Sequence, residues 1–218
     1  MKQLFRITAM AVLLTTLAGC VSTLNVADRS FESARRNRLR GNPEAATQEY
    51  SAAATAYNQS FEANRKDGRT PFLSSRLKAG MSLYWSGQSR AALDLFTTLF
   101  DARDRTRETL VYGGLAAADL GNKDAAVKFW SELGPAHDVY TLRQGVQKAL
   151  AGLDNGSMTT EQAQDTVRQA LLDQDKRDVL QRLTPASQLS GENTCSGRFW
   201  WRYNESPCSS DVRPVRAF

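Results

Sequence analysis

A pattern of four residues occurs twice in this chain, with every position shifted by the same offset. It consists of two glycines, an alanine and an aromatic residue: Gly80, Gly87, Ala92 and Phe96 in the first copy, and Gly114, Gly121, Ala126 and Trp130 in the second. Four matches at one offset are hard to obtain by chance, and periods of about 20 to 50 residues indicate repeat architectures. The sequence therefore predicts stacked, repeated structural units over 73–106 and 107–140.

Each position of the pattern has a packing role in a two-helix unit. The first glycine lies within a helix and lets the second helix approach closely. The second glycine follows the first helix and ends it in the left-handed conformation. The alanine is small where the two helices cross, and the aromatic residue fills the space beneath the next unit. We therefore expect an all-α fold.

A weaker copy of the unit precedes the two regular ones. Gly41, Ala46 and Tyr50 have the same mutual spacing as the later Gly-Ala-aromatic positions. They lie farther upstream than one period, so about 12 residues are inserted between this copy and the next. We expect a helix over about 31–40, a second helix from Pro43, and the insertion as a loop at about 64–72.

The region after Pro135 predicts a C-terminal cap for the stack. We expect a helix over 140–150 and a turn at 154–156. Thr159 and Gln162 form a candidate capping box for the next helix. A separate short helix is expected over 176–183. An end piece of this kind is needed because an ordinary repeat would leave its apolar face in water.

These residues resemble the tetratricopeptide family over about residues 27–140. The period of that family is about 34 residues, which equals the offset from Gly80 to Gly114. The resemblance implies a TPR-like helix-turn-helix solenoid over 31–186, whose concave groove binds protein partners. Carried onto this register, the groove positions are Leu77, Met81, Tyr84, Trp85, Glu108, Leu115 and Asp119. An alternative for the adjacent Tyr84 and Trp85 is that both are half-buried packing residues.

The N-terminus predicts secretion. Lys2 and Arg6 precede an apolar run from Ile7 to Leu17, which is typical of a signal peptide over 1–19. The ending Leu-Ala-Gly-Cys resembles the lipobox of bacterial lipoproteins, which implies acylation of Cys20, a tether over 20–30 and a membrane contact through the lipid anchor. The residue after Cys20 is Val21 and not aspartate, which favours the outer membrane, facing the periplasm. The alternative is an ordinary signal peptide whose cleavage site contains a cysteine.

Charge and cysteine content restrict the partners. Removal of the signal lowers the formal net charge from +5 to +3, which is too mild to indicate nucleic-acid binding. The arginines at 35, 36, 38 and 40 could rest on anionic headgroups near the anchor or form a solvated helix face. With Cys20 acylated, Cys195 and Cys208 remain as a disulfide pair in an oxidising compartment.

The C-terminal segment 187–218 differs from the repeats. Inside the predicted disulfide loop it carries four aromatic residues and an arginine that do not follow helical spacing: Phe199, Trp200, Trp201, Arg202 and Tyr203. Such a composition is typical of a partner-binding hot spot, while packing of these rings on the last helices is the alternative.

No catalytic constellation is found in the sequence. His137 is the only histidine, and no phosphate-binding glycine loop, nucleophile motif or metal-ligand cluster is present. We therefore expect no enzyme activity, no cofactor, no metal and no small-molecule substrate. The expected function is a periplasmic scaffold for subunits of an envelope machine, such as a pilus, a secretion system, a polysaccharide exporter or an outer-membrane assembly complex. The alternatives are an adaptor that docks a peptidoglycan-active enzyme and, third, an unrecognised enzyme.

Overall fold

The computed structural model describes residues 22–134 and 140–183. Within them every regular element is a helix, which confirms the all-α class for this part of the chain: α2 Thr23–Leu39, α3 Pro43–Lys66, α4 Leu73–Trp85, α5 Ser89–Asp101, α6 Arg107–Asp119, α7 Lys123–Ser131, α8 Tyr140–Asp154 and α9 Thr160–Leu183. Several sequence predictions fall outside the described residues: the signal peptide, the lipidation site Cys20, the disulfide pair Cys195 and Cys208, and the aromatic tail.

The period of the sequence pattern is present in the helix boundaries. Helix α6 begins and ends one period after α4, and α7 begins one period after α5. Gly87 and Gly121 adopt left-handed backbone angles, with φ of 82° and 70°, directly after α4 and α6. Both predicted helix ends are therefore confirmed.

The packing role of the other repeat positions is also confirmed. A Cβ added at Gly80 would lie 2.5 Å from Cζ of Phe96, so only glycine lets α4 and α5 approach this closely. Phe96 in turn stacks on Tyr112 of the next unit, with ring centroids 6.1 Å apart. One aromatic side chain thus joins the two helices of its own unit to the unit that follows.

The first helix pair differs from the sequence prediction at two points. The predicted tether is partly helical, because α2 begins at Thr23: Ser22 accepts a hydrogen bond from the Asn25 N–H, and the buried Ala27 packs into the core. The expected loop is present over residues 67–72. The insertion also lengthens α3 to 24 residues, against 13 in α5, so this helix ends at Lys66, a few residues later than expected.

The last helix pair confirms one prediction and corrects another. The Gln162 N–H donates to Thr159 Oγ1 at 3.2 Å, and the Thr159 N–H donates back to Gln162 Oε1 at 2.8 Å, so the capping box is formed. The separate helix at 176–183 does not exist, because α9 continues unbroken from Thr160 to Leu183. The buried Asp175 and Asp178 hold this stretch against the rest of the protein.

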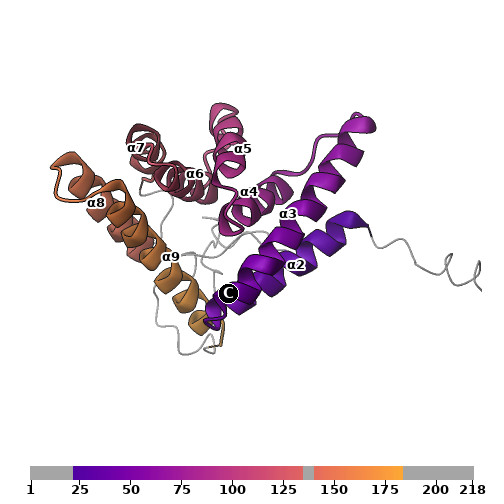
Figure 1. The fold of residues 1–218 in the computed structure, drawn as a ribbon, viewed down its shortest axis with the longest axis horizontal. Helices are drawn as coiled ribbons and strands as arrows, with labels where there is room; N and C mark the ends of the chain where they lie inside the picture. Colours follow the sequence, from indigo (N-terminus) through magenta and orange to yellow (C-terminus); the bar gives the residue numbers. More distant parts are fainter. Residues whose placement is uncertain (1–21, 135–139, 184–218) are drawn as a thin grey trace, which may run out of the picture.

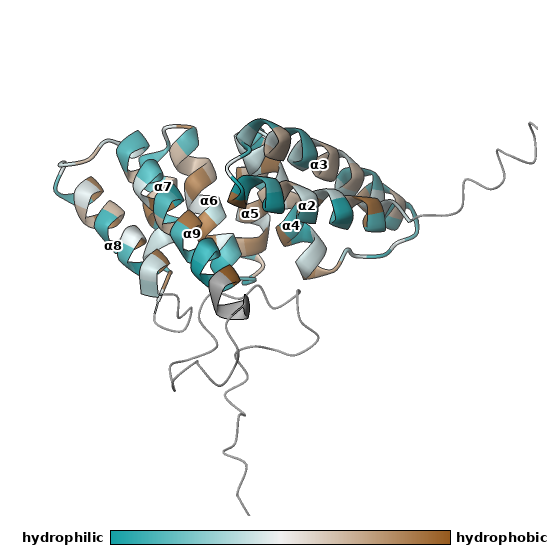
Figure 2. Ribbon diagram, turned by 90° about the horizontal axis from the view of Figure 1, so that it is seen from below, coloured by the Kyte–Doolittle hydropathy of each residue, from teal (hydrophilic) through white to brown (hydrophobic). Residues whose placement is uncertain are grey.

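The helices form an arch (Figure 1). Helices α2 and α3 make one arm, α4 to α7 the middle, and α8 and α9 the other arm. Helix α9 contacts α6 in the middle and also α2 in the opposite arm, so the two arms converge. Most of α9 is hydrophilic on the side seen in Figure 2. None of the described helices is long and apolar enough to cross a membrane.

Candidate functional site: the inner face of the arch

The inner face of the arch carries a cluster of aromatic and charged side chains from five helices. We name it the inner cluster, and its members are Arg35, Arg38, Tyr50, Trp85, Tyr112 and Asp175. Trp85 is its centre: its ring stacks on Tyr50 with centroids 6.3 Å apart, and its Nε1–H donates to the Tyr112 hydroxyl at 3.3 Å. The guanidinium of Arg38 lies 4.5 Å from the Trp85 ring centroid, a cation–π contact.

Helix α9 supplies the negative charge of the inner cluster. Asp175 is 2 % exposed and accepts a hydrogen bond from Arg38, while Arg35 lies 3.8 Å from its other oxygen. Burial by itself would lower the pKa of Arg38, but the charge of Asp175, its hydrogen bond and the nearby Tyr50 and Tyr112 together raise that pKa above its ordinary value. Removal of one partner from such a pair would leave a buried charge uncompensated.

A second charged group lies one turn farther along α9. Asp178 is fully buried and accepts a hydrogen bond from the Gln174 amide at 2.8 Å. Arg107 donates two bonds to one oxygen of Glu108, at 2.8 and 3.0 Å. Burial opposes the charge of Arg107, yet Glu108 and Asp178 together raise its pKa. Asp175 of α9 therefore pairs with cations of α2, while the negative charge of Asp178 favours the charged form of Arg107 on α6.

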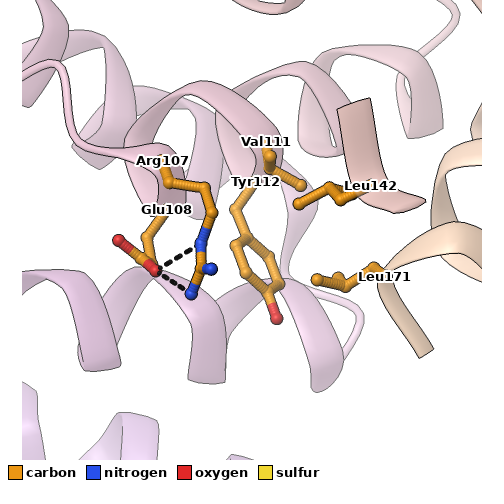
Figure 3. A pocket seen from close by; sticks show the side chains of 6 residues that line it. All are labelled: Arg107, Glu108, Val111, Tyr112, Leu142 and Leu171. Carbon is orange, nitrogen blue, oxygen red and sulfur yellow. Dashed lines mark hydrogen bonds and ion pairs between the residues drawn. The ribbon is translucent and has the colours of Figure 1, made fainter. Parts of the chain in front are cut away.

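A small pocket lies beside this group, between α6, α8 and α9 (Figure 3). It is lined by Arg107, Glu108, Val111, Tyr112, Leu142 and Leu171. Its cavity volume is about 10 Å³, which is room for at most one water molecule and far below the roughly 300–1,000 Å³ of ordinary ligand sites. The Tyr112 ring lies between the Arg107–Glu108 pair and the two leucines, as Figure 3 shows. This pocket is therefore a small packing gap between the three helices.

The N-terminal half of α9 contacts the middle of the arch through polar side chains. Arg168 Nε donates to the Tyr84 hydroxyl at 2.5 Å, and the Gln164 amide donates to Asp119 at 2.8 Å. Burial alone would raise the pKa of Asp119, but hydrogen bonds from Ser89 and Gln164 and the charge of Arg168 lower it below its ordinary value. The ion-paired Asp119 therefore belongs to the interface between α6 and α9.

The seven sequence-predicted groove residues separate into two groups. Leu77, Met81 and Leu115 are at most 1 % exposed and lie in the core. The other four line the inner face, where they contact charged or aromatic residues: Tyr84, Trp85, Glu108 and Asp119. Tyr84 is 3 % exposed and Trp85 is partly buried. Tyr84 and Asp119 contact α9 directly, and Trp85 contacts Arg38, which pairs with Asp175 of α9.

Sequence reasoning did not identify the charged members of the inner cluster as a site. Both interpretations of Arg35 and Arg38, contact with headgroups and a solvated helix face, are wrong, because both arginines face Asp175 and are largely buried. Asp175 and Asp178 stand one turn apart on one side of α9. This spacing of two acids was the sequence signal that could have indicated a charged contact surface on the helix. Their partners could not be found this way, since Arg38 and Asp175 are 137 residues apart.

The described residues show no group of three or more His, Cys, Asp or Glu side chains that could hold a metal ion. Burial raises the pKa of Tyr50, Tyr84 and Tyr112, so these hydroxyls stay protonated near neutral pH. Comparisons with protein-family models, curated proteins and solved structures gave no match for this chain. What the geometry shows is that α9 of the same chain covers the inner face.

Proposed function

We propose that this protein is a lipid-anchored scaffold of the bacterial cell envelope. Its TPR-like solenoid holds a partner protein and helps to assemble or stabilise a multiprotein machine at the outer membrane. Acylation of Cys20 keeps the protein at the membrane, and Cys195 pairs with Cys208 to close the aromatic tail. A weak partner contact then gains from the raised local concentration.

The observation that supports the proposal best is the pair of helix hairpins that repeat at one period, α4–α5 and α6–α7. Repeats of this kind stack into extended concave surfaces, which are used to bind other proteins. The inner face adds the composition expected of a binding surface, with tryptophan, tyrosine and arginine gathered around Trp85. The fold alone names no partner.

Crosslinking in cells, followed by a pull-down of the full chain from membranes, tests the scaffold function. We expect the wild-type chain to recover subunits of an envelope machine and Trp85→Ala to lose some of them. Glu44→Gln, an exposed change in the first turn of α3, is the control. An unchanged partner set in Trp85→Ala would remove the inner face from the proposal, and recovery of peptidoglycan-active enzymes would favour the adaptor alternative.

Membrane attachment is tested separately. We expect the full chain to sediment with membranes and to incorporate labelled palmitate. The change Cys20→Ser should abolish both properties, while Cys195→Ser should leave both intact. Retention of the label after Cys20→Ser would contradict the proposed anchor.

A further inference from the structure

Helix α9 fills the inner face in the same way as a bound helix fills a groove. In its N-terminal half, Gln164 and Arg168 bind the middle of the arch. Its far half places Asp175 against the two arginines of α2, and Asp178 near Arg107 of α6. The two halves therefore contact different parts of the arch.

The far half of α9 shows what chemistry the surface accepts. Asp175, which pairs with Arg35 and Arg38, and the fully buried Asp178 stand one helical turn apart. Arg38 is held in place by its contact with the Trp85 ring. An apolar contact adds to them, because Leu171 is 4 % exposed and lines the pocket with Tyr112. A fitting ligand is therefore an amphipathic helix with a leucine followed by two acids.

We propose that the inner cluster is a docking surface for an acidic helix of a partner protein, and that residues 171–179 of α9 occupy this surface in the free protein. The inference rests on the proposed scaffold function and specifies the chemistry of its partner.

Exchange of α9 for a partner helix is energetically reasonable. A buried ion pair contributes little net stability once the cost of desolvating both charges is counted. Replacement of one Asp–Arg pair by another of the same kind is therefore nearly neutral. The covalent link gives α9 an effective concentration in the millimolar range. A partner helix must therefore make added contacts or be held nearby by the membrane anchor.

A peptide in trans tests the proposal with the protein as it exists. The probe is a fluorescent peptide with the sequence of α9, residues 160–183, titrated with the full mature chain and followed by fluorescence polarisation. We expect weak binding to the wild-type chain, because its own α9 competes. In the Asp175→Asn/Asp178→Asn chain the internal competitor is weakened, so the peptide should bind at least tenfold more tightly. A peptide that carries the same two asparagines should lose that gain.

Three matched variants separate docking from general loosening of the fold. The variant Asp165→Asn changes an exposed acid of the same helix and should leave peptide binding at the wild-type level. Arg38→Gln weakens the contact of α9 but also removes the cation that an acidic peptide would bind, so this variant should not bind the peptide more tightly. Its control, Arg36→Gln, changes an exposed arginine of α2 and should behave as wild type. Circular dichroism checks that each variant keeps its helix content.

The outcomes are distinct. Equal peptide affinity for the wild-type and Asp175→Asn/Asp178→Asn chains, or an equal gain in Arg38→Gln, overturns the docking surface. A positive peptide result with no partner recovered from membranes would instead count against the scaffold function alone. Hydrogen exchange of the folded chains gives an independent check: α9 amides beyond residue 171 should exchange faster in Asp175→Asn/Asp178→Asn than in Asp165→Asn.

Discussion

The indole ring of Trp130 packs directly against Gly114 and occupies the space that a Cβ at this position would need. The indole cannot move aside easily, because it is 1 % exposed and its Nε1–H donates to the Val111 carbonyl at 3.3 Å. The same relationship holds one repeat earlier, between Gly80 and Phe96. Each repeat is therefore defined by a contact between a glycine of its first helix and an aromatic ring of its second helix.

Gly114→Ala should destabilise the protein, because the added methyl group overpacks this contact. Overpacking costs about 1–3 kcal/mol, and the gain in helix propensity offsets roughly 1 kcal/mol of it. We expect a net loss of up to about 2 kcal/mol in the free energy of urea unfolding. Gly134→Ala is the control, since a Cβ there meets nothing within 4 Å. An equal effect of both changes would contradict the packing argument.

Arg103→Gly should stabilise the protein. Arg103 has φ of 64° after α5. Its own N–H and that of the next residue donate to the last turn of α5, in the pattern found at the glycines after α4 and α6. A side chain in the left-handed conformation costs about 1 kcal/mol, so we expect a gain of roughly that size in unfolding free energy. Ala102→Gly, one residue earlier and at negative φ, should be destabilising. A loss of stability in Arg103→Gly would show that the arginine side chain makes a compensating contact.

The ion-paired Asp119 should make stability depend on acid pH. Its pKa is lower in the folded protein than in the unfolded chain, so its contribution is fully present above the ordinary value near 4 and is lost as the pH falls through the folded pKa. The stability difference between wild type and Asp119→Asn should therefore be largest near neutral pH and shrink below about pH 4. Urea unfolding over a pH series measures it. Asp94→Asn, at an exposed position on α5, serves as the reference, and a difference that grows in acid would contradict the sign of the shift.

The predicted disulfide can be tested by alkylation. We expect the mature chain to react with an alkylating reagent at Cys195 and Cys208 only after reduction. Closure of a loop of about 14 residues should also raise stability by roughly 3 kcal/mol, so reduction should lower the urea midpoint if the tail takes part in the cooperative fold. Alkylation of both cysteines without reductant would exclude the bond.

Local structure followed from the sequence wherever a local signal was present. The capping box at Thr159 and the left-handed glycines at 87 and 121 were predicted and are formed, because each depends on hydrogen bonds within one turn of chain. The loop after α3 also formed where Gly68 and Pro71 predicted it, over residues 67–72. The break before residue 176 was predicted wrongly, because no glycine or proline stands there and α9 continues through it.

The sequence by itself determined the helical class, the period of the repeat and the glycine–aromatic contacts within each unit, since all of these arise between residues close in the chain. Only the tertiary structure decided that α9 lies on the inner face and that Asp175 meets Arg38 across 137 residues. The physical reason is cumulative geometry. Small rotations from each helix pair to the next add up until the two arms of the arch converge, and no local pattern records that sum.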